Sequence, residues 1–166
     1  LISGVHDLLP NRVGGAVLQK NLETLGDIQY TQEEIDFALE LQRNNGKPEI
    51  GIDGKIRPLR ETLNSPGGGS TDSGDVSYNV PVVSLAATTA PKGVPWHSWS
   101  VVASSGMSIG HKGMLHAAKA LGMTMVDIFK DSKLRENIKK EFDEKIGEYE
   151  YDPYLDPGPP PIDYVD

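Results

Sequence analysis

The sequence predicts an α/β fold in which a central sheet lies between helices. Two observations lead to this class. Apolar residues recur at helical spacing in four stretches of the chain, and one short apolar run, residues 80–87, is rich in β-branched side chains. Such a run is typical of a strand that is buried on both faces. No internal repeat of about 20 to 50 residues is visible, which disfavours solenoids and propellers.

The first two helices have clear start and stop signals. Asn11 can cap a helix over residues 11–25, which Gly26 would end. Thr31 and Glu34 have the spacing of a capping box, so a second helix is expected from there to about residue 44. This role in the first helical turn explains Glu34, and Glu33 beside it, better than a catalytic pair of carboxylates does.

Two further helices are expected late in the chain, after a Gly- and Pro-rich stretch, residues 46–75, with sparse regular structure. One helix would pack on the sheet through a stripe of apolar and small residues: Met114, Ala117, Ala118, Leu121, Met125 and Ile128. The other would begin with a cap at Ser132 and end at Gly147. Residues 148–166, rich in Tyr, Pro and acidic residues, are expected to form an extended tail on the surface.

Composition excludes several classes of protein. The 166 residues include 16 Lys and Arg against 24 Asp and Glu, a net charge of −8, so nucleic acid is not an expected partner. No stretch approaches the ~20 apolar residues of a membrane span, and no signal peptide is evident. The sequence has no Cys, so any metal must bind to His, Asp or Glu. These features favour a cytoplasmic protein.

A glycine-rich loop, residues 67–75, is the first candidate site. Three consecutive glycines allow backbone N–H groups to converge on an anion, and Ser70 and Thr71 add hydroxyl groups, which would suit a carboxylate ligand. The spacing and the Lys of a phosphate-binding P-loop are absent. Composition alone is equally compatible with a flexible linker.

The second candidate is His97, which lies between Trp96 and Trp99 just beyond the predicted strand. A histidine shielded by indoles could be an oriented metal ligand or base, but spacing alone also fits a packed structural histidine. His111 and His116 are five residues apart, so they point about 140° apart on a helix and cannot chelate one ion together. His116 is expected to pack against the core, and His6 has no partner pattern that would give it a role.

Four segments, in order along the chain, resemble the aminobenzoyl-glutamate utilization protein B group. They are residues 8–11 (Leu-Leu-Pro-Asn), 69–77 (Gly-Ser-Thr-Asp-Ser-Gly-Asp-Val-Ser), 95–99 (Pro-Trp-His-Ser-Trp) and 109–120 (Ile-Gly-His-Lys-Gly-Met-Leu-His-Ala-Ala-Lys-Ala). This group is part of the large metallopeptidase and amidohydrolase family that includes aminoacylase, glutamate carboxypeptidase and succinyl-diaminopimelate desuccinylase.

The resemblance implies a catalytic domain with two divalent metal ions, zinc or manganese, and a small-molecule amide substrate. The last metal ligand of the family falls on His97, with Trp96, Ser98 and His111 as supporting residues. The family's loop near the substrate falls on Gly69, Ser70, Thr71 and Asp72. The other ligands and the catalytic Glu pair of the family lie upstream of these motifs, and this sequence contains neither, so it provides no catalytic residue of its own.

These considerations give a domain plan and a function. Residues 1–9 would be the end of an inserted lid domain or a linker, and residues 10–147 the C-terminal part of the catalytic domain. The chain would then be a fragment of a metal-dependent amidohydrolase that cleaves an N-acyl-amino-acid or aminobenzoyl-glutamate type amide, inactive without its N-terminal half. A homodimer is also expected. The alternatives are a non-catalytic carboxylate-binding module and a structural fragment.

Overall fold

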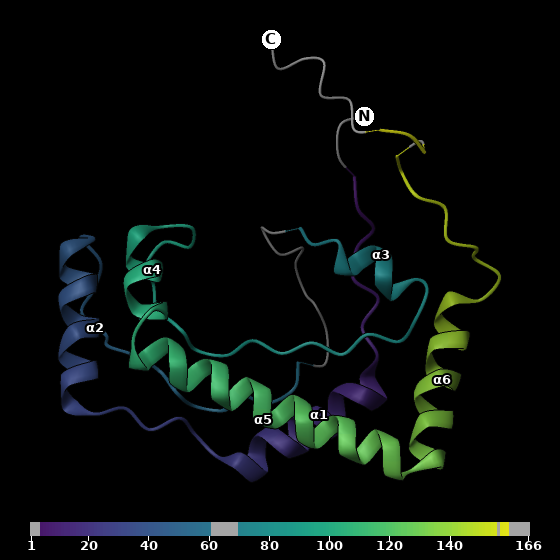
Figure 1. The fold of residues 1–166 in the computed structure, drawn as a ribbon, viewed down its shortest axis with the longest axis horizontal. Helices are drawn as coiled ribbons and strands as arrows, with labels where there is room; N and C mark the ends of the chain where they lie inside the picture. The colour runs from purple at the N-terminus through teal and green to yellow at the C-terminus, as the bar shows by residue number, and fades with distance from the viewer. Residues whose placement is uncertain (1–3, 61–69, 156, 160–166) are drawn as a thin grey trace. The chain divides into compact units, whose positions relative to one another are not determined.

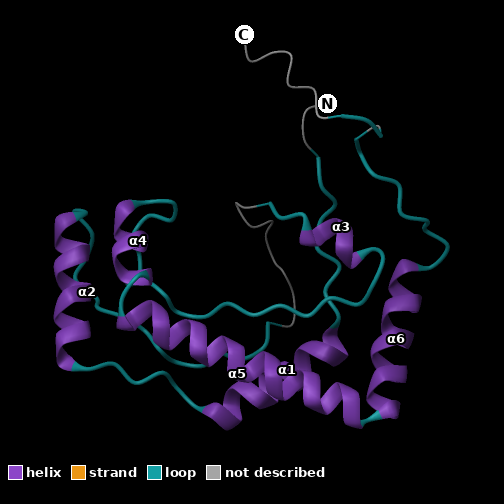
Figure 2. Ribbon diagram, in the orientation of Figure 1, coloured by secondary structure: helices purple, strands orange, loops and turns teal. Residues whose placement is uncertain are grey.

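The computed structural model describes residues 4–60, 70–155 and 157–159, and its helices are drawn in Figures 1 and 2. Within these residues there are six helices: α1 (Arg12–Leu25), α2 (Gln32–Asn44), α3 (Ser73–Ser77), α4 (Trp99–Ser105), α5 (Ser108–Lys130) and α6 (Ser132–Ile146). No helix of this described part is both long and apolar enough to cross a membrane.

The chain divides into two compact units. Unit 1 consists of residues 1–16, 60–83 and 131–166, and its helices are α3, α6 and the first turn of α1. Unit 2 consists of residues 17–59 and 84–130, and it contains the rest of α1 with α2, α4 and α5.

The predicted starts and ends of the first two helices are confirmed. Asn11 caps α1, because its Oδ1 accepts a hydrogen bond from the Gly14 N–H at 2.8 Å. Gly26, at φ +75°, follows the last residue of α1. The capping box of α2 is complete: the Thr31 side chain accepts from the Glu34 N–H, and the Glu34 carboxylate accepts from the Thr31 N–H.

The prediction of an α/β fold is wrong. In the described residues there is no strand, and the apolar run 80–87 is extended backbone with a single isolated parallel bridge, between Pro10 and Val82. One hydrogen bond, from the Asn11 N–H to the Val82 carbonyl at 3.3 Å, accompanies it. The β-branched run favours an extended conformation, but a sheet requires a ladder of hydrogen bonds to a second strand, and the sequence identifies no such strand.

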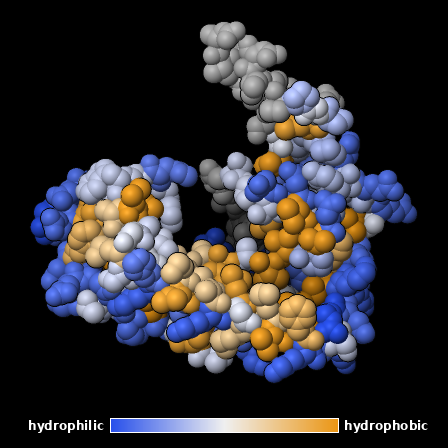
Figure 3. Space-filling view, viewed as in Figure 1, coloured by the Kyte–Doolittle hydropathy of each residue, from blue (hydrophilic) through white to orange (hydrophobic). Residues whose placement is uncertain are grey.

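Two details of the later helices also differ from expectation. Asp131, not Ser132, caps α6, since its carboxylate accepts from the Leu134 N–H at 3.0 Å. Helix α5 forms as predicted, but its fully buried positions are not the predicted stripe; they are Ile109, Gly110, Gly113, Ala120 and Thr124. Most of the predicted stripe is exposed, and Figure 3 shows apolar surface along α5.

Close contacts within unit 2 determine which face of α5 is buried. A Cβ at Gly113 would lie 2.3 Å from the Thr88 carbonyl oxygen, so the chain passes directly against this helix. Farther along, the Asn21 amide of α1 donates to the Thr124 hydroxyl at 3.1 Å and to Asp127 at 2.9 Å. Small and polar residues therefore make this face, which a search for large apolar side chains does not detect.

Candidate functional site

The turn at residues 95–98 presents His97 to solvent. His97 has φ +58°, and in the described residues it is the single non-glycine with a positive φ. The left-handed conformation costs a non-glycine residue about 1 to 2 kcal/mol. The Ser98 hydroxyl donates to the Pro95 carbonyl at 2.6 Å and closes the turn just before α4 begins. Such strain is a common feature of functional sites.

The expected shielding of His97 by indoles is not found. Trp96 is 70% exposed and Trp99 is 57% exposed, and His97 itself is exposed. The imidazole is therefore accessible to a ligand and is not a packed structural histidine. Ser98 supports the turn through its hydrogen bond to Pro95, whereas His111 lies exposed in the first turn of α5.

In unit 2, Lys112 in the first half of α5 forms an ion pair with the buried carboxylate of Glu34 in α2. Lys112 Nζ is 2.6 Å from Glu34 Oε2, and it also donates to the Gln29 carbonyl at 2.9 Å. Burial opposes ionisation of Glu34, but hydrogen bonds from Lys112, Ser108 and the Thr31 backbone outweigh it and lower the pKa of Glu34 to about 2. Burial and the charge of Glu34 raise the pKa of Tyr30 to about 12. This pair joins α2 to α5.

The described part of the predicted substrate loop, residues 70–72, is exposed and leads into α3 in unit 1; Gly69 lies outside the described residues. The Thr71 carbonyl accepts from the Gly74 N–H at 3.1 Å, and the Thr71 hydroxyl accepts from the Ser73 N–H at 3.2 Å. The Asp72 carbonyl accepts from the Val76 N–H at 3.4 Å. These amides are therefore bonded within the turn, whereas the three glycines of the predicted anion site, residues 67–69, lie outside the described residues.

The histidine with the most contacts in the described structure is His6, for which the sequence predicts no role. It is 6% exposed, and its Nδ1 lies 2.7 Å from Asp75 Oδ1 while its Nε2 lies 2.8 Å from the Tyr149 hydroxyl. A carboxylate can only accept, so Nδ1 carries a hydrogen, and Nε2 lies within hydrogen-bond distance of the Tyr149 hydroxyl. Hydrogen bonds from the His6 backbone and ring lower the pKa of Asp75.

Tyrosine rings surround His6. The Tyr154 ring stacks on the imidazole, with centroids 4.2 Å apart and planes 6° apart, and Tyr78 and Tyr151 lie at 4.9 and 5.3 Å. A hydrogen bond from Tyr78 to Asp7, 2.8 Å long, raises the pKa of Tyr78 to about 12, with burial adding to the shift. Within unit 1, the described tail after α6 therefore packs against residues 6 and 78 through aromatic contacts.

The sequence contains no local signal for this cluster. Its hydrogen bonds join residues 69 and 143 positions apart, whereas periodicity and capping rules detect neighbours within a few residues. The close spacing of Tyr149, Tyr151 and Tyr154 in an otherwise polar tail is the one available hint, because exposed tails seldom need several aromatic rings.

The described residues do not by themselves fit a two-metal centre. They contain no group of three or more His, Asp or Glu that could hold an ion, and His97 is a single exposed donor. A two-metal centre needs roughly three protein ligands for each ion. Within the described residues His97 is thus a single candidate ligand, and a two-metal centre would need further donors.

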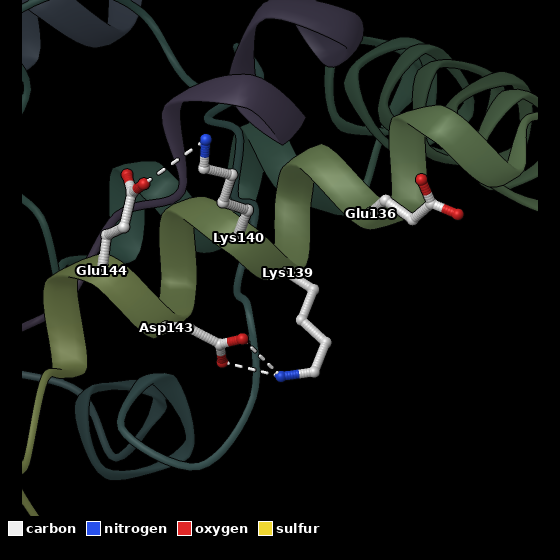
Figure 4. Close-up of a pocket in the computed structure, with 5 residues that line it drawn as sticks. All are labelled: Glu136, Lys139, Lys140, Asp143 and Glu144. Atoms are coloured by element: carbon white, nitrogen blue, oxygen red, sulfur yellow. Dashed lines mark hydrogen bonds and ion pairs between the residues drawn. The ribbon is translucent and has the colours of Figure 1, made fainter.

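A shallow depression on α6 offers no better candidate. All five residues that line it, Glu136, Lys139, Lys140, Asp143 and Glu144, belong to that helix (Figure 4). Lys139 pairs with Asp143 at 2.6 Å and Lys140 pairs with Glu144 at 3.7 Å, both at i,i+4 spacing. Pairs of this kind are ordinary features of an exposed helix surface.

Comparison with known proteins gives one informative match. No family model and no solved structure matches the chain. The chain is 33% identical over 157 residues to the B subunit of p-aminobenzoyl-glutamate hydrolase from Escherichia coli (strain K12), a match that covers 80% of this chain and 33% of that protein. The chain thus spans about a third of the length of this curated relative. The resemblance to the aminobenzoyl-glutamate utilization protein B group that the motifs indicate is confirmed by this match.

Proposed function

We propose that this chain is part of a metal-dependent hydrolase that cleaves an N-acyl-amino-acid or aminobenzoyl-glutamate type amide. The observation that carries the proposal is the 33% identity to a relative named as the B subunit of a p-aminobenzoyl-glutamate hydrolase. The match covers most of this chain and includes no catalytic residue that we can identify here, so the chain alone is expected to be inactive.

His97 is proposed as one ligand of a divalent ion, zinc or manganese. Its exposure and its constrained left-handed backbone support this role, because a ligand must be both accessible and fixed. Ser70, Thr71 and Asp72, with Gly69, are proposed to face the substrate, and the exposure of residues 70–72 supports this role as well. The remaining metal ligands are expected outside this sequence.

The relative's name calls it a subunit, which supports the proposal that this chain works together with further polypeptide. The expected partners are an N-terminal half of the same enzyme and a second copy. The exposed apolar side chains on α4 and α5 agree with burial against other protein, since monomeric proteins seldom expose a large apolar patch.

The test uses the full-length protein that contains these residues. His97→Ala should lower both the bound metal and the rate of p-aminobenzoyl-glutamate hydrolysis by about 100-fold, with an unchanged circular dichroism spectrum. The matched control is Lys119→Ala, at an exposed position of α5, which should keep its metal. Full activity and metal content in the His97 variant would remove the assignment.

A carboxylate-binding module without chemistry is less well supported. Two acidic residues, Asp72 and Asp75, stand beside the predicted anion site and would repel a carboxylate, and the three glycines 67–69 lie outside the described residues. Calorimetry with glutamate separates the two functions, because a module would bind glutamate without added zinc.

A further inference from the structure

We infer that His6 is a positioning residue that holds the predicted substrate loop, residues 70–72, in place by fixing helix α3 through Asp75. This inference rests on the proposed function of that loop. All the residues involved lie in unit 1. Three sets of contacts carry it, from His6 to α3, from α3 to the loop, and from the tail to His6.

The first contact joins His6 and Asp75. One carboxylate oxygen, Oδ1, accepts from the His6 backbone N–H at 3.1 Å and lies 2.7 Å from the ring Nδ1. The main chain and the side chain of one residue therefore hold the same atom. Because His6 is almost fully buried, these bonds compete little with water.

The segment around His6 also lies directly against the α3 backbone. A Cβ at Gly74 would be 1.9 Å from the His6 carbonyl oxygen, so only glycine allows this approach. Three residues later in each segment, the Leu9 N–H donates to the Ser77 hydroxyl at 2.9 Å, and that hydroxyl donates to the Gly74 carbonyl at 2.5 Å. Residues 6–9 thus hold α3 at both of its ends.

The second set of contacts leads from α3 to the loop. The N–H groups of Gly74 and Val76 donate to the carbonyls of Thr71 and Asp72, at 3.1 and 3.4 Å. His6 lies against the Gly74 backbone and binds Asp75, and each of these two residues lies within four positions of Thr71. Any movement of α3 away from His6 would move the backbone of Thr71 and Asp72 with it.

The third set of contacts concerns the tail. Tyr149 binds the opposite ring nitrogen, Nε2, at 2.8 Å, and Tyr154 stacks on the ring face. The tail therefore orients the imidazole but makes no bond through Nδ1. The two nitrogens have separate partners, because Nδ1 binds Asp75 of α3 and Nε2 binds Tyr149 of the tail. The tail also reaches Asp75 without the imidazole, through a side-chain hydrogen bond from Tyr151. This separation makes the inference testable with two amide substitutions.

The experiment compares His6→Asn with His6→Gln. An Asn amide can replace the donor at Nδ1, whereas a Gln amide reaches the position of Nε2. Amide hydrogen exchange in the 166-residue chain should be about tenfold faster at Gly74 and Val76 in His6→Gln, and close to wild type in His6→Asn. Tyr149→Phe removes only the Nε2 bond, so it should leave exchange in α3 unchanged. Exchange at Thr124, in unit 2, is the internal control.

The functional readout is the KM for p-aminobenzoyl-glutamate in the full-length protein. His6→Gln should raise KM about tenfold with kcat nearly unchanged, and His6→Asn should restore it. Equal exchange in the Asn and Gln variants would overturn the inference, as would unchanged exchange in both. If exchange rises in His6→Gln while KM stays at the wild-type value, the inference fails because the loop does not face the substrate, although His6 still holds α3.

Discussion

At the scale of single residues, the packing of one backbone segment against another decides which residue a position accepts. Gly74 is buried in α3 beneath the carbonyl of His6, where no side chain fits. Gly122, in the interior of α5, has no atom from outside its own helix within 4 Å of the position its Cβ would occupy. Both are helical glycines, so their difference comes from tertiary contacts alone.

This contrast predicts opposite effects of the same substitution. Gly74→Ala should destabilise unit 1 by about 3 kcal/mol or more, because the added methyl group meets backbone that cannot move independently. Gly122→Ala should stabilise α5 by about 1 kcal/mol through helix propensity. Urea unfolding monitored by circular dichroism measures both. A stabilising Gly74→Ala would show that His6 does not pass over α3.

Glu34 is a second residue whose role depends on distant contacts. Its spacing to Thr31 predicts the capping box, but nothing in the sequence predicts the bond to Lys112, 78 positions away. Glu34 is 4% exposed, and both of these partners favour its charged form.

The lowered pKa of Glu34 predicts a pH-dependent contribution to stability. The folded pKa, about 2, is below the ordinary value of 4.5, so the contribution is complete above about pH 4.5 and is lost as the pH falls toward 2. Glu34→Gln should therefore destabilise the chain at pH 7 and have a progressively smaller effect below about pH 4.5. Unfolding curves at about pH 7, 4 and 2.5 measure this, with the exposed Glu33→Gln as control. An effect of equal size at every pH would contradict the ion pair.

At the scale of elements, α2 is fixed to its surroundings by a polar residue on its buried face. Gln42 is 0% exposed, and its side-chain amide donates to the carbonyls of Gly51 and Lys92 at 2.9 and 2.8 Å. Its Oε1 accepts from the Gly51 N–H at 2.8 Å. The amide thus satisfies backbone groups of two irregular segments of unit 2, which are also joined directly by the Lys92 N–H and the Gly51 carbonyl at 3.3 Å.

Replacing this amide should be costly. Gln42→Met has a similar volume but removes the hydrogen-bond partner of the Gly51 N–H and of the Lys92 carbonyl, while the Gly51 carbonyl keeps its bond from the Lys92 N–H. We therefore expect a loss of about 2 to 4 kcal/mol in the free energy of unfolding. Gln32→Met, on the exposed first turn of the same helix, should change stability by less than about 0.5 kcal/mol. Thermal and urea unfolding report both variants. Equal stability of the Gln42→Met and Gln32→Met variants would mean that the hydrogen bonds of Gln42 do not stabilise these segments.

Whether a feature can be predicted from the sequence depends on how far apart along the chain its interacting residues lie. Helix ends at Asn11, Gly26, Thr31 and Gly147 are predictable because their signals are local. His97 is singled out by its aromatic neighbours and by the motif resemblance, but its exposure is not predicted, because the sequence suggests an imidazole shielded by indoles. The His6 cluster and the Lys112 ion pair escape prediction, since their partners are distant in sequence and no local pattern encodes them.

At the scale of the whole molecule, the largest error concerns what α5 packs against. The stripe of Met114, Ala117, Ala118, Leu121, Met125 and Ile128 has helical spacing and predicts a face that covers a sheet. In the described structure most of this stripe is exposed, with Met114 and Met125 at 59% and 57%, while the fully buried positions are mainly small residues. A helix that carries apolar residues beyond its buried face is typical of an element that packs within a larger assembly.

The exposed stripe predicts how the isolated chain behaves in solution. Met114→Glu together with Met125→Glu should lower the fluorescence of a hydrophobic dye such as ANS at least about twofold and should reduce self-association in sedimentation, because the two carboxylates interrupt the apolar surface. Glutamate is a good helix former, so helicity should be retained. The control pair, His111→Glu and Lys119→Glu, places the same carboxylates at polar exposed positions of α5 and should leave dye binding unchanged. Equal dye binding in the two double variants would show that the Met114–Met125 face is already covered in solution.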